Sequence, residues 1–402
     1  MKAPPIDGEF RLAHDRLDRL LSESRTSAIA REQAFGPFVN GGQPRPLVLV
    51  GAGRLGRRVG QCLLGLGATI AAYADNDSMR QGTSLHGVQV LSLPEVAELF
   101  GADALFVVTI WNGEHQFIKT YEQLTSLGCR DVVSWVPVAW AAGSDLLPQY
   151  AAGFPTATLA AKEVILAEFG SWSDARSADA YVNQIAWRLS GDFADLDEPA
   201  IDLYFPSDLV RTRPGEVFVD LGAFDGDTVI DFVHRYPDFG VVHAFEPDGE
   251  NFRALSRTVA GLPIDVLDRI HTYQLATGHQ GGWAAFAAGG GASSSMVPAG
   301  IGTRRTTRVR VVRLDDVLGT EEVSFVKMDI EGAEEATLLG AADTIRTKRP
   351  ILAISAYHRQ SDVWELPKLI RSLAKDYSLY LRPHRADSFD CVLYAIPNER
   401  KV

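Results

Sequence analysis

The chain has 402 residues, a hydrophobic share of 46% and a net charge of −12 at pH 7. Because one hydrophobic core rarely exceeds about 250–300 residues, this length predicts two or three domains. The acidic balance argues against nucleic acid or an anionic membrane surface as a partner. Three widely spaced cysteines without metal-ligand spacing, and the lack of a long apolar run, predict a reduced cytoplasmic protein without signal peptide or membrane span.

The first part of the chain predicts a helical segment followed by a small α/β unit. Residues 1–45 carry leucines at helical spacing, which indicates an N-terminal helical segment. Residues 46–143 then alternate short apolar strands with amphipathic helices, beginning with a strand at 47–50. Such alternation is typical of a doubly wound, Rossmann-like sheet.

This front unit also carries a nucleotide-binding pattern. The first strand runs into Gly51-Ala52-Gly53-Arg54-Leu55-Gly56 and a helix, and the second strand ends at Asp75. Glycines at such a turn let a phosphate approach the backbone, and the acid can hold a ribose. Gly51, Gly53, Gly56 and Asp75 are therefore candidate ligands of a nicotinamide or sugar nucleotide. The alternative is that the glycines only permit close packing, and that the unit positions substrate or mediates a homodimer.

Residues 144–210 predict a helical connector rich in aromatic side chains, including Phe154, Trp172 and Tyr204. The simplest interpretation is a helical linker packed between the two α/β units. A lid over a site and a surface for another protein are the alternatives that this composition leaves open.

Residues 211–402 predict the second α/β unit, which is organised around one strand and turn. The strand at 217–221 is apolar without alternation, as in a central parallel strand covered on both faces. It contains Asp220 and runs into Gly222-Ala223-Phe224-Asp225-Gly226-Asp227-Thr228, where a helix begins. Acids without a lysine disfavour a phosphate ligand and suit a cationic or hydroxyl-bearing one. S-adenosylmethionine, with its sulfonium, ribose diol and amino-acid head, fits this description.

The pattern after Glu246 predicts a third strand at 270–276 and an inserted hairpin of 283–287 with 307–312. The ends of the strands predict the rest of the pocket. The strand at 241–246 ends in Glu246, where one carboxylate can accept from both hydroxyls of a ribose. Ligands of doubly wound sheets bind outside the carboxyl ends of the strands, which groups Asp220 and Glu246 with residues 276–278, Asp329 and His358. The candidate cofactor-binding residues of this pocket are Asp220, Gly222, Ala223, Asp225, Asp227, Thr228, Glu246, Pro247 and Thr277.

Four ordered segments of this half resemble the FkbM family of S-adenosylmethionine-dependent methyltransferases. They are Phe218–Thr228, Ala244–Phe252, Val312–Val317 and Phe325–Gly340, within residues 203–397. The resemblance implies a class I methyltransferase fold that closes with an antiparallel strand pair. It also implies transfer of a methyl group to a hydroxyl of a saccharide or secondary metabolite. The predicted fold class is α/β, with two Rossmann-like doubly wound sheets.

Methyl transfer to an alcohol needs a base or a metal, because a hydroxyl is a poor nucleophile until its proton leaves. His358, just past the fifth strand, is the candidate base, and Asp329 is the candidate pocket residue facing cofactor or acceptor. The alternatives are a histidine that bonds a loop carbonyl and an aspartate that caps a helix. Asp329, Glu331 and Glu334 could together hold a divalent cation. We expect no metal, because the helix dipole alone favours acids in a first turn.

The alternative function would depend on the front unit instead of the C-terminal unit. A nicotinamide-dependent oxidoreductase or a non-catalytic binding module would use the glycine turn and Asp75. No Tyr-x-x-x-Lys pattern follows Asp75, which counts against the oxidoreductase. A glycine- and serine-rich stretch, 289–295, predicts either a mobile cover over the substrate or a solvated hairpin tip.

Overall fold

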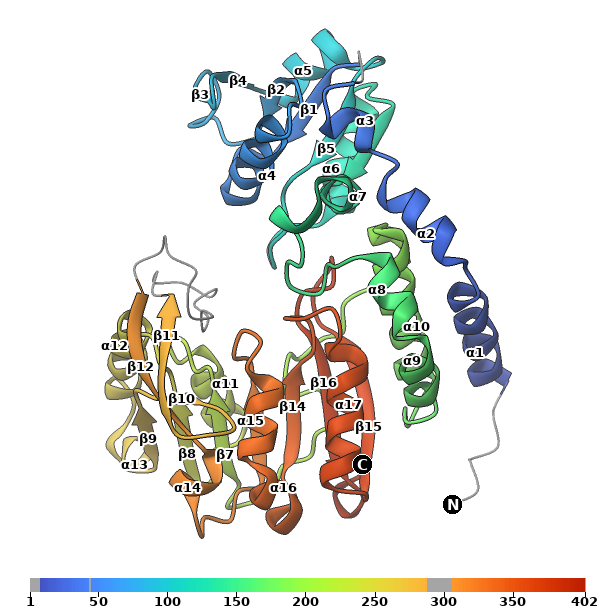
Figure 1. Cartoon of the computed structure of the whole chain (residues 1–402). Helices are drawn as coiled ribbons and strands as arrows, with labels where there is room; N and C mark the ends of the chain where they lie inside the picture. The colour runs from blue at the N-terminus through green and yellow to red at the C-terminus, as the bar shows by residue number, and fades with distance from the viewer. Residues whose placement is uncertain (1–7, 43–44, 288–305, 402) are drawn as a thin grey trace.

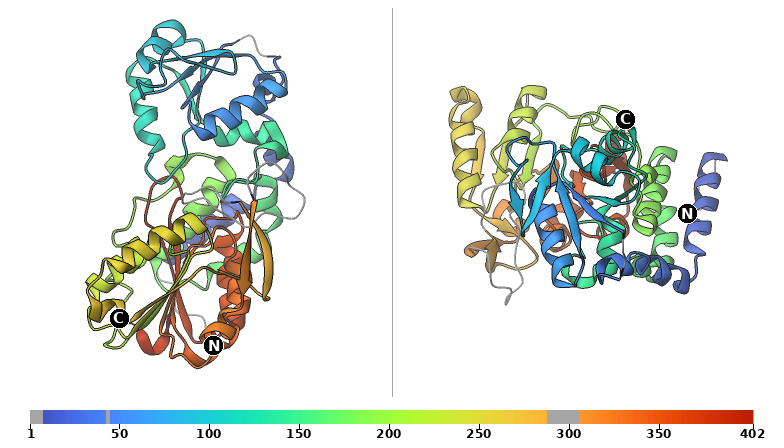
Figure 2. Two further views of the ribbon diagram at one scale, coloured as in Figure 1. Left: turned by 90° about the vertical axis from the view of Figure 1, so that its left-hand side faces the viewer. Right: turned by 90° about the horizontal axis from the view of Figure 1, so that it is seen from above.

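Two large β-sheets organise the described part of the chain, one in each half, and the two halves are stacked in Figure 1. The structure is a computed structural model that describes residues 8–42, 45–287 and 306–401. A side view shows the front unit above the C-terminal unit, with helices running alongside (Figure 2, left). Within the described ranges, no helix has the length and apolarity needed to cross a membrane.

The sheet of the front unit has six strands. Across the sheet they are β3 (Ser84–Leu85), β4 (Val88–Leu91), β2 (Ile70–Ala74), β1 (Leu47–Val50), β5 (Leu105–Val108) and β6 (Asp131–Ser134). All neighbours are parallel except β3 and β4, and every residue of β1 is buried. Its helices are α4 (Arg54–Gly65), α5 (Leu93–Phe100), α6 (Phe117–Ser126) and α7 (Trp135–Ala142). The doubly wound pattern predicted from the sequence is confirmed.

The hairpin of β3 and β4 was not among the predicted elements. Its two-residue turn, His86-Gly87, has positive φ at both positions, 54° and 79°, as the favoured tight hairpin turns require. Histidine is an uncommon choice at such a position, and strands of two and four residues give almost no alternation to detect.

Helices at the side of the molecule link the two units. The N-terminal helices are α1 (Gly8–Leu21), α2 (Arg25–Glu32) and α3 (Gly36–Val39), and the connector supplies α8 (Pro155–Ala160), α9 (Lys162–Phe169) and α10 (Ala175–Ser190). Helix α1 buries Ala13, Leu17 and Leu21, and it packs against α10. The view from above shows α1 outermost (Figure 2). The connector is helical only as far as Ser190, apart from one short turn, so its predicted helical character does not extend to residue 210.

The sheet of the C-terminal unit has seven strands. In spatial order they are β9 (Ile270–Tyr273), β8 (Val241–Phe245), β7 (Val217–Leu221), β13 (Phe325–Met328), β14 (Ile351–Ser355), β16 (Cys391–Pro397) and β15 (Tyr377–Pro383). Strands β9 to β14 are parallel, and β16 is antiparallel to both neighbours. The direction of winding changes between β7 and β13, which is where such sheets bind ligands.

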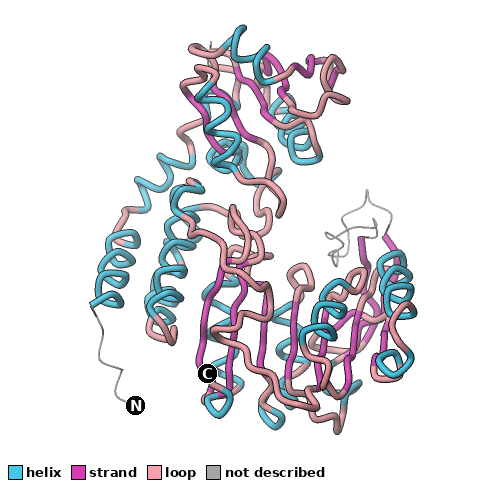
Figure 3. Tube along the Cα trace, turned by 180° about the vertical axis from the view of Figure 1, so that it is seen from behind, coloured by secondary structure: helices cyan, strands magenta, loops and turns pink. Residues whose placement is uncertain are grey.

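Alternate residues of β7 belong to different cores, because successive side chains of a strand point to opposite faces. Phe218 stacks on Phe232 of α11 (Asp227–Arg235), with ring centroids 4.2 Å apart. Val219 lies in the core that contains α15 (Glu334–Gly340), α16 (Ala342–Lys348) and α17 (Asp362–Leu373). Figure 3 shows the helices and strands of both units from behind. Both faces of the sheet are therefore covered, which explains the unbroken apolar run in the sequence.

One predicted strand is wrong in its extent. The stretch 270–276 was expected as a single third strand, but β9 ends at Tyr273. Ala276 and Thr277 form β10, which pairs with Val311 and Val312 in a separate three-stranded sheet. The other strands of that sheet are β11 (Gly282–Ala287) and β12 (Thr306–Val312), which form the predicted antiparallel pair. The glycine- and serine-rich stretch 289–295 lies outside the described residues.

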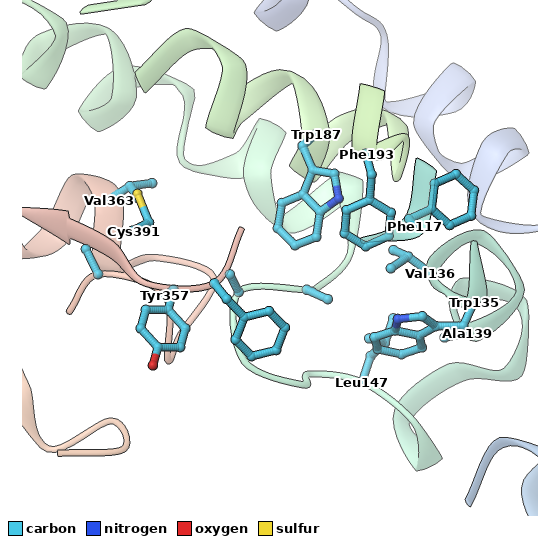
Figure 4. Close-up of a cluster of buried hydrophobic side chains, with 14 of the residues drawn as sticks. Phe117, Trp135, Val136, Ala139, Leu147, Trp187, Phe193, Tyr357, Val363 and Cys391 are labelled. Atoms are coloured by element: carbon cyan, nitrogen blue, oxygen red, sulfur yellow. The ribbon is translucent and has the colours of Figure 1, made fainter. Parts of the chain in front are cut away.

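Aromatic side chains from both units and the connector meet in one buried cluster (Figure 4). Trp111 of the front unit lies 5.0 Å from Phe389 of the C-terminal unit and 6.1 Å from Trp187 of α10, measured between ring centroids. The indole N–H of Trp111 also donates to the carbonyl oxygen of Asp387 at 2.8 Å. Each aromatic pair of this kind contributes about 0.5–1.5 kcal/mol beyond its buried area. The cluster therefore fixes one unit against the other.

Candidate active site

The turn after β7 requires its glycine. Gly222 has φ of 82°, and a Cβ built there would come within 1.9 Å of the carbonyl oxygen of Asp329. The backbone of this turn therefore lies directly against the end of β13. Phe224 also has positive φ, 48°, which a non-glycine residue rarely adopts. Its N–H donates to Oε2 of Glu246 at 3.0 Å, so the second acid of the pocket holds the turn in place.

Glu246 follows β8 and is 5% exposed. Its Oε1 accepts from the N–H of Asp248 at 2.8 Å, so each carboxylate oxygen already accepts one backbone hydrogen bond. Burial raises the pKa of Glu246 to about 7, even though the two N–H donors act to lower it. Each carboxylate oxygen has a second lone pair, which leaves capacity for two hydroxyl donors. These acceptor oxygens fit the ribose diol that the sequence predicted here.

Asp220 is fully buried and does not open onto the pocket. Its Oδ1 lies 2.9 Å from Nζ of Lys327, and the same ammonium donates to the carbonyl oxygen of Gly222 at 2.7 Å. Burial raises the pKa of Asp220, and Lys327 opposes that rise. The structure thus gives Asp220 a supporting position beneath the turn, with its carboxylate directed at Lys327.

The remaining cofactor candidates lie in the turn after β7, beside Glu246 and against α15. Ala223, Asp225, Asp227 and Thr228 lie in the turn or at the start of α11, where Oδ1 of Asp227 accepts from the N–H of Thr228 at 2.6 Å. Pro247, next to Glu246, is half-buried. Thr277 is buried against α15, and its hydroxyl hydrogen-bonds Thr337 at 3.0 Å. The hydroxyl of Thr277, which was predicted to face the cofactor, is therefore already hydrogen-bonded to the hydroxyl of Thr337.

His358 lies just past β14 among carboxylates. Its Nδ1 is 2.8 Å from Oε1 of Glu334, and its Nε2 is 3.2 Å from Oδ1 of Asp329. Burial alone would lower the pKa of His358, but Glu334 and Asp329 outweigh it and raise that pKa well above its usual value. The imidazole is therefore protonated at neutral pH and is poorly suited to accept another proton. The predicted role of His358 as base does not agree with this environment.

Asp329 lies at the end of β13 and stays ionised. Burial would raise its pKa, but the hydrogen bond and charge of His358, with Lys327 and Tyr204, lower it far below the usual range. The phenol of Tyr204 donates to Oδ2 of Asp329 at 2.8 Å. Helix α15 begins after Ala333, so Asp329 does not cap it, and the helix-cap alternative is wrong.

Glu331 precedes the helix in a strained turn, with φ of 54°. Its side chain is 17% exposed, and its Oε1 lies 3.9 Å from Nε2 of His358. Burial, together with the negative charges of Asp329 and Glu334, raises the pKa of Glu331 to about 7, against the lowering effect of His358. A half-buried acid with a pKa near neutrality, in a strained conformation beside an imidazolium, is well matched to proton transfer.

Tyr150 brings the connector to this site. Its ring centroid lies 6.0 Å from that of His358, and it adopts φ of 48°. Burial and the neighbouring Glu331 raise the pKa of its phenol. The sequence does not predict that Tyr150, Tyr204 and Glu331 lie in one site, because only the fold brings these separated residues together. Among the described residues, no group of three His, Cys, Asp or Glu side chains is arranged to hold a metal ion.

In the front unit, the glycine turn is as tight as predicted. Gly51 has φ of 106°, and a Cβ on Gly56 would lie 1.8 Å from the carbonyl oxygen of Gly51. Asp75, however, is occupied, since its Oδ2 accepts from the N–H of Ala52 at 2.7 Å and from Nη1 of Arg80 at 3.0 Å. Burial would raise the pKa of Asp75, but these hydrogen bonds and the charge of Arg80 lower it. The carboxylate of Asp75, which was expected to bind a ribose, instead accepts hydrogen bonds from the turn and from Arg80.

The strand order of the C-terminal sheet, with its single antiparallel strand β16, is that of a class I methyltransferase. Residues 220–379 match the family model described as the methyltransferase FkbM domain. The C-terminal half is therefore a methyltransferase domain of the FkbM family, and this family implies S-adenosylmethionine as cofactor. The glycine cradle at Gly222 and the acceptor oxygens of Glu246 fit that cofactor.

The fold as a whole is also found in a solved structure. A crystal structure described as methyltransferase FkbM from Methylobacillus flagellatus KT superposes with a TM-score of 0.71. The match covers 92% of this chain and 98% of that chain at 22% sequence identity, so it establishes the fold of both units. No curated protein sequence matches the chain significantly.

Proposed function

We propose that the chain is an S-adenosylmethionine-dependent O-methyltransferase that acts on a hydroxyl of a saccharide or related small molecule. The observation that carries this proposal is Glu331, an acid with a pKa of about 7 beside the strand end that carries Asp329. A methyltransferase that acts on a thiol or an amine has less need of such a base, because those nucleophiles react without first losing a strongly held proton.

The cofactor would be held at the carboxyl ends of β7 and β8. Glu246 would accept hydrogen bonds from the ribose, and the turn at Gly222 would admit the ligand close to the backbone. When bound, S-adenosylmethionine supplies an electrophilic methyl group, and the electrons of its C–S bond stay on sulfur as a neutral thioether. The acids of the turn favour a cationic ligand before transfer over its neutral product.

Glu331 would accept the proton of the acceptor hydroxyl as the oxygen forms its bond to the methyl carbon. Protonated His358 would fix the two carboxylates of Asp329 and Glu334, and its positive charge keeps Glu331 from an even higher pKa. His358 is thus a positioning residue in this proposal. The half-buried ring of Tyr150 beside these carboxylates would suit a saccharide, whose hydroxyls donate to carboxylates and whose C–H faces are apolar.

Two measurements test the proposal. Calorimetric titration with S-adenosylhomocysteine should give saturable binding, and Glu246→Gln should weaken it about tenfold by removing a charged acceptor. Incubation with methyl-labelled S-adenosylmethionine and a panel of saccharides should then transfer label to an oxygen. The product should gain the mass of one methyl group, and the label should survive treatment with alkali, as a methyl ether does. Label that appears on nitrogen or sulfur, or failure of the intact protein to bind S-adenosylhomocysteine, would contradict it.

A further inference from the structure

A cavity of about 460 Å³ lies at the glycine turn of the front unit. Four arginines line it, Arg54, Arg57, Arg58 and Arg80, together with Ala52, Gly53 and Gln61. Among the described residues that line it, none is acidic, although the chain as a whole carries a net charge of −12. Such a concentration of guanidinium groups in an acidic protein favours an anionic ligand at this position.

Three of the four arginines come from one face of α4. Arg54, Arg57 and Arg58 are spaced by three and four positions, which places them on the same side of the helix. Arg80 faces them from the loop after β2, where it pairs with Asp75 and lies 3.3 Å from Asp77. Asp75 and Asp77 therefore both pair with Arg80. Guanidinium groups gathered in this way match the geometry of phosphate oxygens.

The start of α4 adds a second source of positive potential. Its N-cap is Gly53, which offers no side chain to the first N–H groups of a helix of twelve residues. A Cβ on Gly53 would lie 3.5 Å from Nη1 of Arg80, so that guanidinium covers the turn. A dinucleotide would need Asp75 for its ribose, but Asp75 is occupied. A phosphate group needs no such acid and gains from both the helix terminus and the arginines.

Two consecutive residues, Gln149 and Tyr150, link the lining of the cavity to the candidate active site. Arg58 holds Gln149, and the next residue, Tyr150, places its ring beside His358. The phenol of Tyr150 is influenced by Glu331 from the site and by Arg54 from the cavity, which shift its pKa in opposite directions. A single molecule that reached past Tyr150 would therefore meet arginines at one end and the proposed base at the other.

We propose that the methyl acceptor is a phosphate-bearing saccharide, whose phosphate or diphosphate binds the four arginines while its hydroxyl lies at Glu331. This inference rests on the proposed function, since it assigns the acceptor of that same reaction. A sugar phosphate and a nucleoside diphosphate sugar share this chemistry. The front unit is then the part of the enzyme that recognises the acceptor.

The test starts with inorganic pyrophosphate, titrated calorimetrically into the intact protein. Binding should be saturable, should weaken with salt, and should fall about tenfold or more in Arg57→Glu, which reverses a charge in the cavity. Arg130→Glu is the matched control, because Arg130 is an exposed arginine of the same unit away from the cavity, and it should bind as the parent does. Binding of S-adenosylhomocysteine should be equal in all three proteins, which shows that the variants are folded.

Acceptor assays complete the test. Labelled methyl transfer should be faster to glucose 1-phosphate or to uridine diphosphate glucose than to free glucose, and Arg57→Glu should remove that preference. The faster of the two phosphorylated acceptors identifies the source of the anion. Equal pyrophosphate binding by parent and Arg57→Glu, or displacement of pyrophosphate by NADH without any preference for phosphorylated acceptors, would overturn the inference. Failure to bind S-adenosylhomocysteine would instead overturn the proposed function.

Discussion

Lys327 and Asp220 face each other directly across neighbouring strands, with Nζ and Oδ1 2.9 Å apart and both side chains buried. The ammonium also donates to the carbonyl oxygen of Gly222. One buried ion pair thus ties the switch point of the sheet to the turn that would meet the cofactor. Its partners lie far apart in sequence, and only strand register brings them together.

Removing the lysine should destabilise the fold. Lys327→Met leaves the carboxylate of Asp220 buried without its counter-charge, so the free energy of unfolding should fall by about 3–5 kcal/mol. The double variant Asp220→Asn with Lys327→Met should recover most of that loss, because neither charge remains. Urea unfolding of the three proteins checks this, and equal stability of the single variant and the parent would contradict it.

Replacing the proposed base should slow methyl transfer without affecting the cofactor. In Glu331→Gln we expect kcat to fall by about 10²–10⁴-fold, while the Kd of S-adenosylhomocysteine is unchanged. In the parent, kcat should rise as pH increases through about 7, because the base must be ionised to accept a proton. Glu335→Gln, an exposed neighbour on α15, serves as control and should behave as the parent does. Undiminished kcat in Glu331→Gln would exclude it as the base.

The role of His358 can be separated from that of a base by the pH profile. The positive charge of His358 acts to lower the pKa of Glu331. In His358→Gln, the midpoint of the rise of kcat should therefore move to higher pH, and activity should return in alkaline buffer. If His358 were itself the base, activity would be lost at every pH. Steady-state rates across neutral and alkaline buffers distinguish the two outcomes.

Stability should depend on pH with a definite sign. The pKa values of Glu246 and Glu331 are each raised from 4.5 to about 7 in the folded chain, so the folded state binds their protons more tightly than the unfolded state. Their contribution is fully present below the unfolded value of 4.5, and it is lost as pH rises through about 7. The free energy of unfolding should therefore fall between about pH 5 and pH 8.

The double variant Glu246→Gln with Glu331→Gln should show a shallower decline over that range. Some slope should remain, because the pKa values of Asp362 and Asp390 are also raised by burial, to about 7 and about 6. Urea unfolding in a series of buffers across this range measures both slopes. Identical slopes for the parent and the double variant would show that burial does not raise the pKa values of these two glutamates.

The sequence predicted the sheets and the backbone of the site because those depend on local pattern. An apolar run without alternation marked β7, and the glycines and acids after it marked the turn. Lys327 is a single cation in a buried strand, which was a detectable signal of a buried partner. The partner itself required the strand register of the structure.

The rest depended on tertiary structure. Asp75 has the position of a ribose-binding acid in the sequence, but Arg80 and the N–H of Ala52 take up its oxygens. Tyr150 reaches His358 from a distant segment of the chain, the connector. The raised pKa of Glu331 arises first from burial, which the sequence does not reveal. The two carboxylates that add to it, Asp329 and Glu334, are its neighbours in sequence.

The contact of Trp111 with Phe389 and Asp387 has a consequence for regioselectivity. Because this aromatic and hydrogen-bonded contact joins the two units, it would hold the arginine cavity at one distance from Glu331. An acceptor anchored by its anionic end would present whichever hydroxyl stands at that fixed distance. The distance between the anionic group and each hydroxyl would then decide which hydroxyl is methylated. No group that recognises each hydroxyl separately would be needed.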